Sequence, residues 1–243
     1  ELAQKFNEML DQMEELKQKE YQAKQLLNRA EYKALQAQVN PHFLYNTLDT
    51  MASIAEIRNC PEVSHMSQSL ALIFRYSLNM KDPFSTVENE IAHLKNYIYV
   101  MDMRMHDNIQ YTFDVDEMTL KSKLPRLSLQ PIVENAINHG LRNKRGKKKI
   151  GIQIKREQMD LVICIEDNGI GLDTSAINES LRKNELDFVE KGNSIGLHNI
   201  NARLKMLYGN QYGMHLESTL GEGTKVFMIL PDSGEDSNNE EKD

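Results

Sequence analysis

Several features are scarce in this sequence of 243 residues, and each scarcity excludes a class of protein. There is no tryptophan, there are two cysteines, and no long run of apolar residues occurs. Because a membrane-crossing helix needs a run of about 18 apolar residues, we expect none within the chain, and the sequence shows no signal-peptide pattern. Cys60 and Cys164 are far apart without metal-ligand spacing, which favours reduced thiols, as in a cytoplasm, over a disulfide framework.

A basic excess is missing as well. The formal net charge is −7, and most of it lies in residues 232–243, which hold six acidic side chains and one lysine. The remaining body is nearly neutral, which argues against a nucleic-acid surface. The basic cluster at residues 142–149 has no aromatic residues between its charges, so we interpret it as a solvated loop with no nucleic-acid partner. The polar, acidic tail 232–243 is expected to be disordered.

Glycine and proline are absent from residues 1–39. Apolar residues there follow alternating steps of four and three, with Glu20 as one polar break: Leu2, Phe6, Met9, Met13, Leu16, Ala23, Leu27, Ala30, Ala34 and Ala37. This spacing is typical of a coiled-coil seam and predicts a parallel homodimer. The alternative is one amphipathic helix packed on its own domain. Because the chain enters this pattern directly at Glu1, we expect it to be part of a longer protein.

The next segment is predicted to remain helical after an interruption at Asn40-Pro41, because proline disfavours the helical region for the residue before it. We expect the pattern to resume up to about residue 59, a second helix over about 62–80, and a third that ends near 106. The third begins at Ser85-Thr86-Val87-Glu88, a candidate capping box.

From residue 107 the periodicity changes to a mixture of strands and helices. Strands are expected at 109–115, 149–156, 159–166, 213–218 and 224–230, helices at about 127–141 and 196–208, and irregular structure at 172–193. Together with the helical first half, this predicts an α+β fold, with an elongated helical dimerisation stalk followed by a mixed α/β sandwich.

Four short segments of the second half contain residues suited to binding a phosphorylated ligand. Asn135, Asn138 and His139 share a helix face, where an amide oxygen can ligate Mg²⁺; an exposed polar face is the alternative. Asp167 ends an apolar strand and is followed by Gly169 and Gly171, which permit close backbone approach, although a glycine-rich turn would look the same.

The other two segments are equally ambiguous when taken alone. Gly192 and Gly196 flank a helix start, where free backbone N–H groups suit phosphate oxygens, or where the chain is simply capped. Gly221-Glu222-Gly223-Thr224 could be a plain hairpin.

The order and spacing of these four segments resemble the N, G1, G2 and terminal boxes of the Bergerat-type ATPase fold, which gyrase, Hsp90, mismatch-repair ATPases and histidine kinases share. The resemblance covers about residues 125–231. It implies that ATP and Mg²⁺ are bound, with Asn135 as the Mg²⁺ ligand, Asp167 on adenine, and Gly169 and Gly171 beneath the nucleotide. The resemblance also implies that residues 172–193 form the ATP lid, with Gly192 and Gly196 as its hinges. Further residues implied to lie at the nucleotide are Asn138, His139, Leu197 and Thr224.

The first half distinguishes among the branches of that superfamily. The segment from Ala37 to Leu48, with Pro41-His42-Phe43 at its centre, resembles the phosphoacceptor box of the LytS/YesM-type sensor histidine kinases, and residues 90–104 and 129–135 are similar to that family too. Residues 1–9 resemble the end of a HAMP linker, which implies the cytoplasmic portion of a bacterial cell-membrane receptor. The domains implied are a coiled-coil signalling helix (1–39), a dimerisation and phosphotransfer region (40–106), the ATP-binding domain (107–231) and the tail (232–243).

The activity implied is ATP-dependent autophosphorylation of His42, then transfer of the phosphoryl group to an aspartate of a response regulator receiver domain. A neutral imidazole is an established covalent nucleophile. Asn46 lies four residues after His42, on the same helix face, and could hold a water that dephosphorylates the regulator; it could equally cap or pack near Pro41.

Two departures from the resemblance keep other functions open. Relatives usually carry a lysine where this sequence has Asn138, and Phe43 stands where other histidine kinases place an acidic residue. One rival is an ATP-hydrolysing clamp like gyrase or Hsp90, but Pro131 occupies the position of its catalytic glutamate, and Glu134 points about 100° away from Asn135. The other is a dimeric scaffold that binds nucleotide without turnover.

Overall fold

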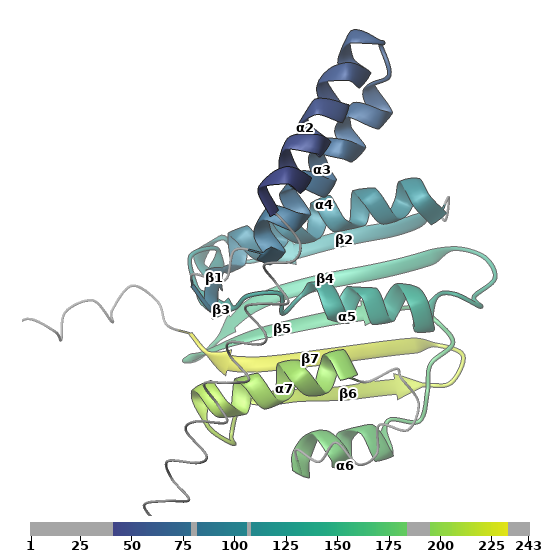
Figure 1. Ribbon diagram of the computed structural model, residues 1–243. Helices are drawn as coiled ribbons and strands as arrows, with labels where there is room; N and C mark the ends of the chain where they lie inside the picture. The colour runs from purple at the N-terminus through teal and green to yellow at the C-terminus, as the bar shows by residue number, and fades with distance from the viewer. Residues whose placement is uncertain (1–40, 79–81, 106–107, 184–194, 233–243) are drawn as a thin grey trace, which may run out of the picture. The chain divides into compact units, whose positions relative to one another are not determined.

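A computed structural model of the chain describes residues 41–78, 82–105, 108–183 and 195–232 (Figure 1). The chain divides into two compact units, residues 1–47 and 48–243. The described part of the first unit is the start of helix α2 (Pro41–Ile57). The predicted coiled coil of residues 1–39 and the tail after Asp232 lie outside the described residues.

The three helices expected between residues 41 and 106 are confirmed where the structure describes them. They are α2, α3 (Pro61–Leu78) and α4 (Val87–Met105). Both α2 and α3 begin with proline, whose missing N–H is not needed in the first turn. None of the described helices combines the length and the hydropathy that crossing a bilayer requires.

The start of α4 differs from the prediction by one residue. Thr86, not Ser85, caps the helix, because its Oγ accepts a hydrogen bond of 3.3 Å from the N–H of Asn89. Ser85 lies instead in a short strand, β1 (Phe84–Thr86), which pairs antiparallel with β3 (Lys123–Pro125). The helix therefore begins one residue later than predicted, because Ser85 pairs with a strand that is far away in sequence. The local pattern does not reveal this pairing.

Five strands form the main sheet, in the order β2 (Ile109–Val115), β4 (Lys148–Glu157), β5 (Asp160–Asp167), β7 (Gly223–Pro231) and β6 (Gly213–Thr219). All neighbours are antiparallel except β2 and β4, which run parallel. The five predicted strands are confirmed. The connection from β2 to β4 carries a short 3₁₀ turn (Glu117–Thr119), β3 and α5 (Gln130–Asn135).

The core lies between this sheet and the helices. Alternate strand residues, among them Ile152, Ile154 and Ile163, are almost fully buried, as expected for a sheet with one covered face. Helices α4, α5 and α7 (Ile195–Tyr208) lie over that face (Figure 1). The opposite face carries polar pairs such as Lys155 with Asp114, 3.0 Å apart. The α+β fold class is therefore confirmed.

The segment 172–193, expected to be irregular, contains a further helix, α6 (Ser175–Lys183). Its end is held by α7: Asn201 Nδ2 donates to the carbonyl of Leu181 at 2.8 Å, and Lys205 Nζ donates to the carbonyls of Leu181 and Arg182 at 2.7 and 2.8 Å. Carbonyls at a helix end need such partners. These donors come from another helix, so the local sequence of α6 does not reveal them.

Candidate functional site

The second unit contains a cavity of about 560 Å³ between the helical layer and the sheet. Its wall is largely apolar: Ile132, Ile165, Ile170, Leu172, Ile177, Leu197, Leu216 and Val226. Its polar lining includes Asn135, Asn138, His139, Arg142, Asn143, Asp167 and Thr224. Cavities of roughly 300–1,000 Å³ with apolar walls and a few polar groups are the usual form of small-molecule sites.

Asp167 supplies the carboxylate of this cavity. It is the last residue of β5, where the buried alternation of that strand ends. Its Oδ1 accepts a hydrogen bond of 2.7 Å from the N–H of Gly169. Burial raises the pKa of Asp167 above its usual range, and backbone hydrogen bonds from Gly169 and Thr224 oppose that rise. A partly desolvated carboxylate is a strong acceptor for a ligand's N–H group.

Two of the predicted glycines are required by the protein itself. A Cβ on Gly169 would collide with the carbonyl of Gly140, which also accepts a hydrogen bond of 3.0 Å from the N–H of Ile170. Gly171 has φ +67°, and a Cβ there would collide with the carbonyl of Thr219. Gly171 lines the cavity, whereas Gly169 is not among its lining residues. The loop after β5 therefore owes both glycines to close backbone packing.

The helix expected over about 127–141 is shorter and changes type. The α-helix α5 begins at Gln130, and from Ala136 to Gly140 the chain forms a π-helical turn, in which the N–H of Leu141 donates to the carbonyl of Ala136 at 2.8 Å. The assumption that Asn138 and His139 lie on a regular α-helix with Asn135 was wrong. All three nevertheless line the cavity, and such π turns are frequent at functional sites.

Asn135 is the residue best placed to contact a bound polar group. Its Nδ2 is buried and has no hydrogen-bond partner among the described residues. An unsatisfied buried donor is rare, since it loses about 1–3 kcal/mol of solvation without return. A ligand oxygen in the cavity would satisfy it.

Arg142 also lines the cavity, although the sequence placed it in a solvated basic loop. No periodic signal in the sequence indicated this, because the chain between Asn138 and Arg142 is not a regular α-helix. Arg142 therefore adds a cationic side chain to the cavity that Asn138 also lines. Arginine is well suited to phosphate oxygens because its guanidinium is planar, permanently charged and rich in donors.

Of the remaining residues predicted to contact the nucleotide, two line the cavity and the others do not or are not described. Leu197, in the first turn of α7, and Thr224, near the start of β7, are buried and line the cavity. The Oγ1 of Thr224 lies 3.0 Å from Ser218 Oγ. Gly196 packs near Pro131 and does not line the cavity. Gly192 lies outside the described residues.

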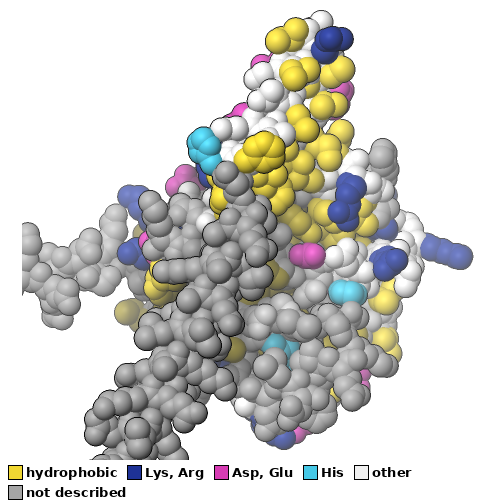
Figure 2. Space-filling model, viewed as in Figure 1, with side chains coloured by type: hydrophobic (Ala, Val, Ile, Leu, Met, Phe, Trp, Pro, Cys, Tyr) yellow, Lys and Arg dark blue, Asp and Glu magenta, His cyan; other side chains and the backbone are white. Residues whose placement is uncertain are grey.

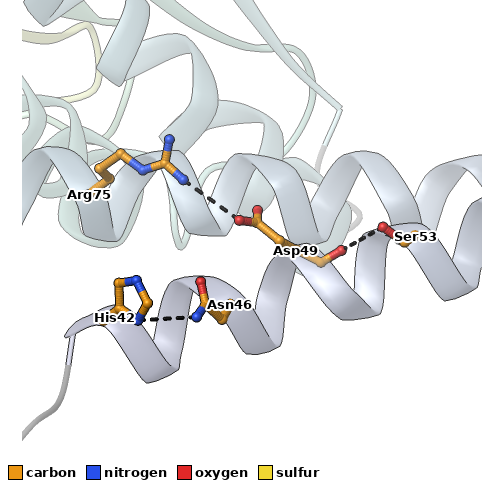
Figure 3. Close-up of polar contacts among 5 residues, drawn as sticks. All are labelled: His42, Asn46, Asp49, Ser53 and Arg75. Carbon is orange, nitrogen blue, oxygen red and sulfur yellow. Dashed lines mark hydrogen bonds and ion pairs between the residues drawn. The ribbon is translucent and has the colours of Figure 1, made fainter.

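His42 and Asn46 lie in the first unit, at the beginning of α2 (Figure 3). Both side chains are exposed. Asn46 Nδ2 lies 3.1 Å from His42 Nδ1, so the predicted sharing of one helix face is confirmed. Which atom donates depends on the tautomer and on the orientation of the amide.

The helices α2 and α3 expose large apolar side chains (Figure 2). Within the second unit, Met51, Ile54 and Ile57 of α2 are 51%, 54% and 78% exposed, and Val63 and Leu72 of α3 are 53% and 47% exposed. Exposed apolar side chains gathered on two neighbouring helices are a candidate interaction surface. An exposed ion pair also joins the two helices, with Arg75 Nη2 3.7 Å from Asp49 Oδ2 (Figure 3).

Two family models match the sequence. The model described as histidine kinase matches residues 30–109, and the model described as histidine kinase-, DNA gyrase B- and HSP90-like ATPase matches residues 123–234. The gap between the two matches, residues 110–122, contains most of β2 and the 3₁₀ turn Glu117–Thr119.

Similar proteins of full length include sensor histidine kinases. YesM of Bacillus subtilis is 31% identical over 93% of this chain and 37% of its own length. LytS of Oceanobacillus iheyensis is 33% identical over 86% of this chain and 35% of its own length. The chain therefore spans little more than a third of the length of these relatives. Among solved structures, the histidine kinase domain of the Erythrobacter litoralis EL346 blue-light activated histidine kinase aligns with 83% of this chain and 93% of its own, at 17% identity and a TM-score of 0.45.

Proposed function

Because this chain belongs to the histidine kinase family, we propose that it transfers the γ-phosphoryl group of ATP to its own His42 and then to an aspartate of a response regulator. The observation that carries the proposal is the cavity, which gathers Asp167, Asn135 and Thr224 from β5, α5 and β7. The exposed imidazole of His42 supplies the acceptor.

The apolar part of the cavity suits the adenine ring. Asp167 would accept the amino proton of adenine, with Thr224 beside it, while Ile170 and Val226 would contact the ring. The apolar side chains would bind the faces of the ring, and the hydrogen bond to the carboxylate would fix its orientation. Small-molecule sites commonly divide the two tasks in this way. The loop through Gly169 and Gly171 would keep Asp167 in place by its backbone hydrogen bond.

The polar part of the cavity suits the phosphates and a Mg²⁺ ion. Asn135 would bind Mg²⁺ through Oδ1, and its Nδ2, unpartnered among the described residues, would donate to a phosphate oxygen. Asn138, His139 and Arg142 line the same region, and Leu197, Gly196 and Gly192 would belong to the lid side. When bound, Mg²⁺ neutralises charge that develops on the phosphates during transfer.

The transfer step uses a lone pair on the imidazole of His42. One ring nitrogen attacks the γ-phosphorus, an N–P bond forms, the bond from that phosphorus to the β,γ-bridging oxygen breaks, and ADP leaves. In the neutral imidazole, Asn46 Nδ2 donates to Nδ1 of His42 across the 3.1 Å contact, so the ring proton resides on Nε2 in this arrangement. In the second transfer, an aspartate oxygen of the regulator takes the phosphoryl group and the N–P bond breaks.

We assign the chain four regions that match these tasks. They are a signalling coiled coil at the end of a HAMP-like linker (1–39), a dimerisation and phosphotransfer region (40–106), the ATP-binding domain (107–231) and the tail (232–243). The exposed apolar residues of α2 and α3 support homodimerisation. The intact protein would be a membrane-anchored receptor whose sensing part precedes this chain.

Autophosphorylation with [γ-³²P]ATP tests the proposal. Wild type and His65→Ala should be labelled equally, because His65 is an exposed histidine of α3 outside the phosphoacceptor segment, whereas His42→Ala should lose the label. The phosphoryl group should be acid-labile and base-stable, as an N–P bond is.

The same assay separates the rival functions. Phosphate release without labelled protein would identify an ATP-hydrolysing clamp, and ATP binding with neither product would identify a scaffold. Labelling of His42→Ala at the wild-type level would refute the assignment of the acceptor.

A further inference from the structure

Glu90 of α4 is a fully buried carboxylate that the phosphotransfer chemistry does not use. Its Oε1 accepts from the N–H of Leu127 at 2.8 Å, and its Oε2 accepts from the N–H of Ser128 at 2.9 Å and of Leu129 at 3.2 Å. Tyr76 donates its hydroxyl to the same carboxylate. A buried charge is retained only when its lone pairs are satisfied in this way.

The three amides that Glu90 binds lead directly into α5, the helix that ends at Asn135. Leu129 stands at the N-cap position and makes no side-chain capping bond. Leu127 has φ +56°, a left-handed conformation that leucine rarely adopts. Glu90 therefore holds the turn that leads into α5, and of the three amides that of Leu129 belongs to the helix start, where a free N–H favours a carboxylate.

Two arginines tie the same turn to its surroundings. Arg126 precedes the bound amides and donates through Nη2 to the carbonyl of Tyr76 at 3.1 Å. Arg203 of α7 donates through Nη2 to Ser128 Oγ at 3.1 Å. The entry of α5 is thus held from α3, α4 and α7 at once.

Tyr76 lies in the last turn of α3 and is the residue through which that helix reaches the network. Its ring lies between the guanidinium of Arg126, 4.0 Å from the ring centre, and the stacked ring of His93, 4.3 Å away. Burial and the neighbouring Glu90 raise the pKa of Tyr76 far above its usual range, so the hydroxyl remains a donor. His93 in turn contacts the first residue of α5, with Nε2 2.6 Å from Gln130 Oε1.

We propose that Glu90 is a positioning residue of the ATP site, and that the hydroxyl of Tyr76 is the contact by which the end of α3 controls the position of α5 and hence of Asn135. The proposal rests on the proposed function, since it takes the cavity to be the ATP site. A shift of α3 that draws Tyr76 away frees one oxygen of Glu90 and loosens its hold on Leu127. The phosphate end of the site then responds first, because Asn135 lies at the far end of the same helix.

The test is Tyr76→Phe, which keeps the ring between Arg126 and His93 and removes only the hydroxyl. The matched control is Tyr111→Phe, since the hydroxyl of Tyr111 also donates to a carboxylate of α4, Asp102, at 3.3 Å. Mg-ATP and adenosine binding are measured by calorimetry on the whole chain. Removing one such hydrogen bond should weaken Mg-ATP roughly fivefold to tenfold, with adenosine changed less than twofold and the control equal to wild type.

Hydrogen exchange gives a second readout that a general loss of stability would not produce. In Tyr76→Phe, the amides of 127–129 should exchange faster while those of β5 do not change. Glu90→Gln should act in the same direction, and adding Tyr76→Phe to it should produce little further loss. Two outcomes would overturn the proposal: equal Mg-ATP affinity in Tyr76→Phe and Tyr111→Phe, or an equal loss of affinity for Mg-ATP and for adenosine in Tyr76→Phe. Failure of wild type to bind ATP would instead refute the proposed function.

Discussion

Replacing Asp167 with asparagine tests how the cavity recognises adenine. In the wild type, Oδ1 accepts from the N–H of Gly169 at 2.7 Å. An asparagine must place its oxygen at that position, because its NH₂ group cannot accept a hydrogen bond. The other atom of the side chain then changes from an acceptor into a donor. It would face the amino group of adenine, itself a donor, and both would be left unpaired.

The magnitude follows from this mismatch. A buried polar group left without its partner loses about 1–3 kcal/mol, and a central value of about 2 kcal/mol corresponds to roughly 30-fold weaker ATP binding. Inosine triphosphate carries a carbonyl where adenine carries the amino group, so its affinity should decrease much less in Asp167→Asn. We therefore expect the ratio of ATP to inosine triphosphate affinity to fall by about tenfold or more in Asp167→Asn.

Calorimetry with both nucleotides measures this ratio directly. Asp173→Asn is the matched control, because Asp173 Oδ1 also accepts from the N–H two residues later, Ser175, at 2.9 Å, but Asp173 is exposed and outside the cavity lining. An unchanged nucleotide ratio in Asp167→Asn would refute the assignment of Asp167 to adenine, whatever happens to the affinity itself.

The raised pKa of Asp167 adds a dependence on pH. Because burial raises that pKa in the folded chain, the folded state holds the proton more tightly than the unfolded state. Stability therefore increases as pH falls from neutral through the raised pKa, while ATP affinity decreases because the carboxylate acceptor is lost. Because the backbone N–H of Thr224 also donates to Asp167, thermal unfolding of Asp167→Asn at pH 7 should accompany the binding measurement, so that a loss of stability is separated from a loss of ATP binding.

Three further changes test other parts of the site. Arg142→Ala should weaken ATP roughly tenfold without affecting adenosine, since a charged hydrogen bond contributes about 1.5 kcal/mol or more; equal effects in the Arg145→Ala control, outside the cavity lining, would contradict a phosphate contact. Light scattering should give about twice the chain mass for wild type and a smaller mass for Ile54→Asp. The control is Met159→Asp, at a turn residue that is 80% exposed, which should remain dimeric. A dimeric Ile54→Asp would place the interface elsewhere. Asn46→Ala should abolish dephosphorylation of the regulator while autophosphorylation persists, and parallel loss of both activities would make Asn46 structural.

The sequence by itself determined the elements whose signals are local. Alternation at 109–115 and short apolar runs such as 161–165 predicted the strands, because buried strand faces are apolar and the side-chain period of a strand is two. Prolines located the starts of α2 and α3, since their missing N–H suits the first turn. The order of the short motifs indicated the ATPase resemblance, and the structure brings Asn135, Asp167 and Thr224 to one cavity.

Only the tertiary structure decided the features whose partners lie far away in the chain. Thr86 became the cap of α4 because β1 pairs with a strand nearly forty residues later, and α6 forms where carbonyls at its end receive donors from α7. Glu90 reads in the sequence as one more charge on a helix, yet it is buried because amides some forty residues away need an acceptor. A local pattern records which face of an element avoids water, whereas the partner of a buried polar group is chosen by packing between elements, and that choice leaves no periodic trace in the sequence.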